Sequence, residues 1–109
     1  MIKIWAWISN NGIIYGIGSK HGNRVKHVLE HLRIDTSKPI HTVFNVKRNE
    51  LIGLIDEAWI RRADIFSSRN NNNSYVINMH RVIGTNGETK IEIVVKANTS
   101  EIITAYPKK

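Results

Sequence analysis

Hydrophobic residues in the first half of the chain recur at helical spacing in two segments, residues 20–33 and 49–64. Ser19 is a suitable N-cap for the first helix, and Asn49 for the second. Arg61 and Arg62 fall in the last turns of the second helix, where cations suit the helix dipole. The two apolar stripes consist of Val25, Val28, Leu29 and Leu32, and of Leu51, Ile52, Ile55, Ala58, Trp59 and Ala63.

Two short apolar runs, residues 2–8 and 13–17, precede these helices. Asn10, Asn11 and Gly12 between them are typical turn residues. The first run fits either a strand or a short helix, and the pair of runs fits a β-hairpin.

The second half of the chain alternates with a period of two, which predicts strands over residues 75–83, 89–96 and 101–106. Asn86-Gly87 is a strong hairpin turn signal, and Pro107 is expected to close the last strand. The asparagine-rich residues 69–74 are expected to form a loop. Helices followed by an antiparallel meander predict an α+β fold. The middle strand places Ile91, Ile93 and Val95 on one face and Lys90, Glu92 and Lys96 on the other.

Composition narrows the possible functions. The 109 residues predict a single domain, residues 1–109, and the absence of cysteine excludes thiol catalysis, disulfides and thiolate metal sites. Sixteen Lys and Arg against nine Asp and Glu give a formal charge of +7, which favours an anionic partner such as nucleic acid. No apolar run is long enough for a membrane helix, and residues 2–8 are too short for a signal sequence. We expect a cytosolic protein or a piece of a larger one.

One face of the first predicted helix carries a cluster suited to cutting RNA without metal. Its members are spaced four, three and four residues apart, so consecutive members are neighbours. An imidazole can take the proton of a 2′-hydroxyl or give one to the leaving 5′-oxygen, and a fixed cation stabilises charge on the phosphoryl oxygens. The same pattern also fits a solvated basic surface. The cluster is Lys20, Arg24, His27 and His31.

Metal chemistry is not expected here. His27 and His31 have the spacing of a zinc pair, but no Glu directly follows the first histidine and the surroundings are positive. The acidic residues are scattered, whereas a two-metal nuclease needs converging carboxylates. The one adjacent acidic pair, Asp56-Glu57, is expected to be solvated.

Five segments together resemble the C-terminal toxin domains of bacterial polymorphic toxins, including contact-dependent growth inhibition effectors. The segments are Lys20-His21, residues 27–31, Lys38-Pro39, residues 41–44 and the closing residues 102–107. They are similar to toxins of the barnase/EndoU/colicin/RelE-like ribonuclease superfamily, and the first 19 residues stay unassigned. The resemblance implies N-terminal helices packed on a twisted antiparallel sheet.

The resemblance also implies an activity and partners. The activity is metal-independent cleavage of RNA, often tRNA, that leaves a 2′,3′-cyclic phosphate and needs no cofactor. The partners are a cognate immunity protein, expected to be acidic, and in some cases a host accessory factor. Such a domain would be delivered as part of a larger secreted effector and act in the cytoplasm of a target cell.

Carried onto this chain, the resemblance makes His21 the first acid/base candidate, with Lys20 as the cation and Thr104 and Tyr106 on the last strand as phosphate-orienting groups. His27 and His31 remain secondary catalytic candidates, and one of His80 and Arg81 could join the site.

Trp59 is expected in the core, whereas Trp5 and Trp7 could stack on bases. Alternatives are a non-catalytic RNA-binding module and an interaction protein with an acidic partner. The substrate-binding candidates are Arg24, Lys26, Arg33, Thr42 and Lys96.

Overall fold

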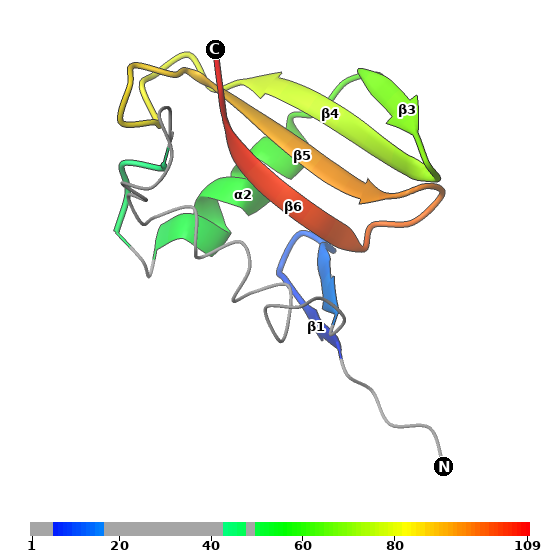
Figure 1. Cartoon of the computed structure of the whole chain (residues 1–109). Coiled ribbons are helices and arrows are strands. Elements are labelled where there is room, and N and C mark those ends of the chain that lie inside the picture. Colours follow the sequence, from blue (N-terminus) through cyan, green and yellow to red (C-terminus); the bar gives the residue numbers. More distant parts are fainter. Residues whose placement is uncertain (1–5, 17–42, 48–49) are drawn as a thin grey trace, which may run out of the picture.

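The computed structural model describes residues 6–16, 43–47 and 50–109 (Figure 1). Within these ranges a helix and an antiparallel sheet are present, which confirms the α+β class. The predicted helix over residues 20–33 lies outside the described residues. The elements, in chain order, are β1 (Ala6–Ile8), β2 (Ile14–Gly16), α2 (Leu51–Ile60), β3 (Ser67–Arg69), β4 (Asn72–Asn78), β5 (Lys90–Lys96) and β6 (Ile102–Lys108).

The main sheet is an antiparallel meander in the order β3-β4-β5-β6. The predicted alternation of β5 is confirmed, because Ile91, Ile93 and Val95 are almost fully buried on one face. The last strand does not stop at Pro107 as predicted but continues to Lys108. A proline is tolerated there because β6 is an edge strand, so no neighbour needs its missing N–H.

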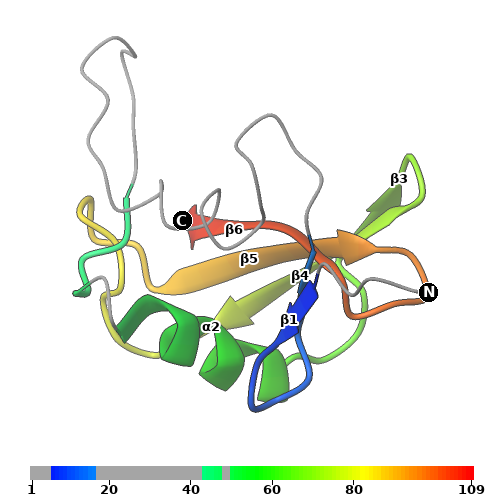
Figure 2. The same cartoon turned by 90° about the horizontal axis from the view of Figure 1, so that it is seen from below.

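The helix α2 packs its apolar stripe against β4 and β5 (Figure 2). Leu51, Ile55 and Trp59 are buried, and the Trp59 ring meets the Tyr75 ring edge-on with centroids 5.5 Å apart. The helix is shorter than predicted. It begins after Glu50 and ends at Ile60 with a tightened last turn, in which the Arg62 backbone N–H donates to the Trp59 carbonyl oxygen at 3.3 Å. The Arg62 guanidinium donates to the same oxygen at 2.7 Å.

The loop predicted for residues 69–74 is wrong. Asn70 and Asn71 form a two-residue turn with φ of 53° and 63°, which joins β3 directly to β4. Asparagine tolerates this left-handed conformation, so the run makes a tight hairpin rather than a loop. Asn73 and Ser74 are then buried within β4.

The β4–β5 connection also differs from the prediction. β4 ends at Asn78 instead of Ile83, because the Asn78 side chain accepts the backbone N–H of His80, which has a φ of 57°. The Asn86-Gly87 turn is present, with Gly87 at a φ of 84°, but it lies inside a longer connection rather than a tight hairpin.

The predicted N-terminal hairpin is confirmed, with β1 and β2 paired antiparallel around the turn at Gly12. The expectation that Asp56 is solvated is wrong. Its carboxylate is buried and accepts hydrogen bonds from the Ser9 hydroxyl and the Asn11 backbone N–H, so it fastens the hairpin to α2. In the described part of the chain, no helix has the length and hydropathy needed to cross a membrane.

Candidate active site

The sheet has two faces of different character. Figure 2 shows α2 on one side of the four strands, where the isoleucines of β5 are buried. Alternate residues of each strand point to the opposite side, which we call the outer face. No helix among the described residues covers it. By strand register, its central residues are Ser74 and Val76 on β4, Glu92 and Val94 on β5, and Thr104, Tyr106 and Lys108 on β6.

Glu92 is the centre of this face. It is only 8% exposed, although it lies on the side of the sheet away from the apolar core. The ammonium of Lys108 lies 3.0 Å from Glu92 Oε1. Tyr106 is the direct cross-strand partner of Glu92, and its hydroxyl donates a hydrogen bond to the carboxylate. A buried carboxylate is therefore held by a cation and a phenol.

The same contacts set the protonation state of Tyr106. Burial, followed by the hydrogen bond to Glu92 and the charge of Glu92, raises the pKa of the Tyr106 hydroxyl from 10.0 to about 12. The phenol therefore stays protonated near neutral pH and acts as a hydrogen-bond donor at this site.

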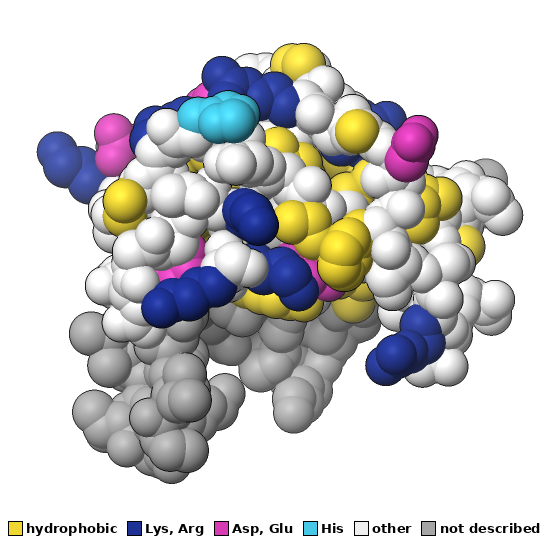
Figure 3. Space-filling view, turned by 90° about the horizontal axis from the view of Figure 1, so that it is seen from above, with side chains coloured by type: hydrophobic (Ala, Val, Ile, Leu, Met, Phe, Trp, Pro, Cys, Tyr) yellow, Lys and Arg dark blue, Asp and Glu magenta, His cyan; other side chains and the backbone are white. Residues whose placement is uncertain are grey.

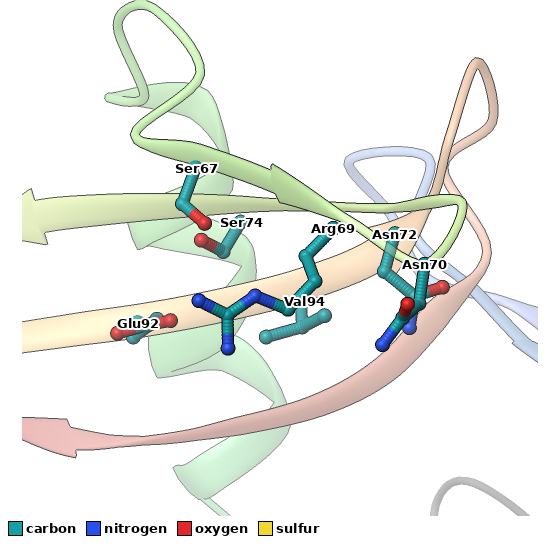
Figure 4. Close-up of a pocket in the computed structure, with 7 residues that line it drawn as sticks. All are labelled: Ser67, Arg69, Asn70, Asn72, Ser74, Glu92 and Val94. Atoms are coloured by element: carbon teal, nitrogen blue, oxygen red, sulfur yellow. The ribbon is translucent and has the colours of Figure 1, made fainter.

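A polar pocket of about 300 Å³ opens beside Glu92 (Figure 4). In Figure 4 the guanidinium of Arg69 extends over Val94 toward Glu92, and the hydroxyls of Ser67 and Ser74 point toward each other. Ser74 is 6% exposed, and its hydroxyl has no hydrogen-bond partner in the structure. The lining residues are Ser67, Arg69, Asn70, Asn72, Ser74, Glu92 and Val94.

An exposed aromatic ring borders the site. Phe66 is 60% exposed, and the Lys108 ammonium lies 5.2 Å from the centre of its ring. Figure 3 shows Lys and Arg side chains spread over the surface seen from above, with hydrophobic side chains exposed among them. A carboxylate, cations, hydroxyls and an aromatic ring are therefore close together near one face of the sheet.

Two of the predicted catalytic residues, Thr104 and Tyr106, lie on the outer face as expected from their spacing on one strand. Lys96 is on the same face but near its end, where its ammonium pairs with Glu101 at 3.1 Å. The other predicted site residues lie outside the described residues, and their positions stay predictions. They are Lys20, His21, Arg24, Lys26, His27, His31, Arg33 and Thr42.

Arg81 does not join this site, since its guanidinium forms a bidentate ion pair with Glu57 on α2.

The sequence analysis did not identify four site residues of the outer face, which are Glu92, Lys108, Arg69 and Ser74. The signal for Glu92 was present, because it is the one acidic residue within the otherwise apolar stretch 91–95. Its burial could not be predicted from alternation, which predicts solvent exposure on this face.

Among the described residues, no three His, Asp or Glu side chains converge where they could hold a metal ion. No protein-family model, curated protein or solved structure matches this chain. The chemistry of the outer face itself therefore carries the functional proposal.

Proposed function

We propose that the protein is a metal-independent endoribonuclease toxin that cleaves RNA on the outer face of the sheet. The observation that carries this proposal is the buried carboxylate of Glu92, which is held by Lys108 and Tyr106 on a surface of a strongly basic chain. A purely RNA-binding surface gains nothing from a buried carboxylate, because the carboxylate neutralises a cation that could otherwise bind a phosphate. A ribonuclease needs such a group as a proton acceptor.

The proposed reaction uses the substrate's own 2′-hydroxyl as the nucleophile. Glu92 takes the 2′-hydroxyl proton while the 2′-oxygen attacks the adjacent phosphorus, and the bond to the 5′-oxygen of the next nucleotide breaks. The 5′-oxygen leaves with a proton from a general acid, and a 2′,3′-cyclic phosphate remains. Lys108 stabilises the charge that develops on the non-bridging oxygens. Tyr106 orients the Glu92 carboxylate, and Thr104 on the same strand hydrogen-bonds the phosphate.

The proton for the leaving group is assigned to His21, with Lys20 as an additional cation and His27 or His31 as the alternative acids. This assignment rests on the resemblance to toxin ribonucleases and on the ability of imidazole to give and take protons near neutral pH. Arg24, Lys26, Arg33 and Thr42 would hold the RNA strand.

The finer fold also belongs to the proposal. An antiparallel meander with a helix on one face and a polar outer face is compatible with the barnase/EndoU/colicin/RelE-like superfamily. Membership would place the helix of residues 20–33 against the sheet and bring His21 toward Tyr106. The proposed substrate is then tRNA, and the proposed inhibitor is an acidic immunity protein. The domain would enter a target cell as part of a larger effector.

The test is an RNA cleavage assay with the purified chain in the presence of EDTA. The wild-type protein should cleave tRNA, and Glu92→Gln and His21→Ala should each lower the rate by about 10²-fold or more. The matched control is Arg81→Gln, which removes a charge on the helix side and should keep full activity. If the wild type binds RNA with a steep salt dependence but makes no product, the chain is a binding module and the catalytic proposal is wrong.

A further inference from the structure

The pocket beside Glu92 contains a hydroxyl whose hydrogen-bonding capacity is unused. Ser74 is 94% buried, its hydroxyl has no partner in the structure, and it lines the pocket. A buried hydroxyl without a partner is costly, so folded proteins seldom keep one unless something binds it. The Ser67 hydroxyl faces it across the β3–β4 pair (Figure 4).

Arg69 supplies the charge that defines the ligand. Its guanidinium extends over the pocket, and it forms no salt bridge or hydrogen bond with any of the described residues. Glu92 on the pocket wall is already neutralised by Lys108 at 3.0 Å. The net charge that the pocket offers is therefore positive, and a monoanion with several acceptor oxygens fits it.

We propose that Ser67, Arg69 and Ser74 form a subsite for a phosphodiester group, separate from the one that is cleaved. The groups assigned to the cleaved phosphate, Tyr106 and Lys108, lie on β6, beyond β5 from this pocket. The Glu92 side chain lies between the two groups, because it lines the pocket and also contacts Lys108 at 3.0 Å. The subsite is assigned to the phosphate of a neighbouring nucleotide because Ser67, Arg69 and Ser74 come from β3 and β4, on the opposite side of β5 from Tyr106 and Lys108.

This inference rests on the proposed function for the identity of the polymer, but the anion site itself does not depend on cleavage. It also predicts a substrate preference. RNA with a phosphate beyond the cleaved one should be a better substrate than a dinucleotide, because the additional contact adds binding.

The test uses binding and cleavage in parallel. Binding is followed by amide NMR shifts with inorganic phosphate and with a 2′-deoxy tetranucleotide, which lacks the nucleophile and cannot be cut. Wild type should show shifts at residues 67, 69 and 74. Ser74→Ala and Arg69→Gln should each weaken tetranucleotide binding about tenfold. Ser74→Thr, which keeps the hydroxyl, should restore most of it.

Matched controls separate the subsite from general effects. Ser68→Ala changes the neighbouring serine, whose hydroxyl donates to Asn73, and Arg61→Gln removes a cation on the helix side. Both should bind the tetranucleotide as wild type does. Ser74→Ala should also unfold at the same or a higher temperature than wild type, because it removes an unsatisfied buried hydroxyl.

The outcomes distinguish the two proposals. Unchanged binding in Ser74→Ala and Arg69→Gln overturns the subsite even if the protein cleaves RNA. Binding that depends on both residues supports the subsite even if no RNA is cut, in which case the ribonuclease proposal fails. If Ser74→Ala does not fold, the test rests on Arg69→Gln, whose side chain is exposed. Equal tetranucleotide binding by Arg69→Gln and the control Arg61→Gln then overturns the inference.

Discussion

Tyr106 and Glu92 are cross-strand partners on the outer face of the sheet, and the tyrosine hydroxyl donates a hydrogen bond to the carboxylate. The pair links the last strand, on which sequence motifs placed two site residues, to an acidic residue that no motif marked. Because the two strands fix both backbones, the geometry of the pair does not depend on a loop.

The alkaline titration of Tyr106 tests this pair without any assumption about function. Its folded-state pKa, about 12, exceeds the unfolded value of 10.0, so the folded protein holds this proton more tightly. The stability that the pair contributes is therefore fully present below pH 10 and is lost as the pH rises through about 12. Burial also raises the pKa of Tyr15, so tyrosinate absorbance should show two late-titrating groups in the wild type. One of them should be absent in Tyr106→Phe, and the same one should shift to lower pH in Glu92→Gln. If the pKa of Tyr106 is the same in Glu92→Gln as in the wild type, the hydrogen bond between the two side chains is contradicted.

Lys108 and Glu92 should be energetically coupled. Lys108→Gln leaves a buried carboxylate without its cation, whereas Glu92→Gln leaves a partly exposed ammonium that water can solvate. We expect Lys108→Gln to be the more destabilising change, and the double variant to recover about 1 kcal/mol relative to additivity. Urea unfolding of the wild type, the two single variants and the double variant gives the four free energies of this double-mutant cycle. Strictly additive free energies of unfolding would show that the ion pair contributes nothing.

Asp56 should be a stability residue rather than a site residue. Replacing it with Ala leaves the buried Ser9 hydroxyl and the Asn11 backbone N–H without their acceptor, which should lower the free energy of unfolding by about 2–3 kcal/mol. The neighbouring Glu57→Ala removes exposed ion pairs and should cost less than about 1 kcal/mol. Thermal unfolding of both variants makes the comparison, and equal losses would contradict the burial of Asp56.

The Asn70-Asn71 turn makes a prediction about backbone strain. Asn71 has a φ of 63°, a region that a β-branched side chain enters at a cost of about 1–2 kcal/mol. Asn71→Val should therefore lower the denaturant midpoint, while Asn71→Gly should leave it unchanged or raise it. A neutral Asn71→Val would show that these residues form a flexible loop, as their composition alone suggests.

Much of the sheet could be predicted from the sequence because its core side obeys a simple rule. Ile91, Ile93 and Val95 alternate with polar residues, and that alternation alone predicts the strand and its buried face. The asparagines at positions 72 and 73 were placed in a loop because asparagine disfavours strands. Pairing with β3 and β5 on both sides outweighs that preference.

The site was predicted only in part, for a related physical reason. The spacing of Thr104 and Tyr106 is enough to place them on one face of a strand. The role of Glu92 depends on which residues of β4 and β6 lie opposite it, and register is not contained in the pattern of one strand. The predicted partners on residues 20–33 lie outside the described residues, so their approach to Tyr106 stays a prediction.

The chemistry of the cleaved ends tests the central proposal most directly. A short RNA should be incubated with the wild-type chain in EDTA and its fragments analysed by mass, alongside the same RNA with a single 2′-deoxy nucleotide at the cleavage position. The proposal predicts a 2′,3′-cyclic phosphate on the upstream fragment and complete resistance of the deoxy substrate. Glu92→Gln should form the cyclic product about 10²-fold more slowly. Cleavage of the deoxy substrate, or full activity of Glu92→Gln, would contradict it.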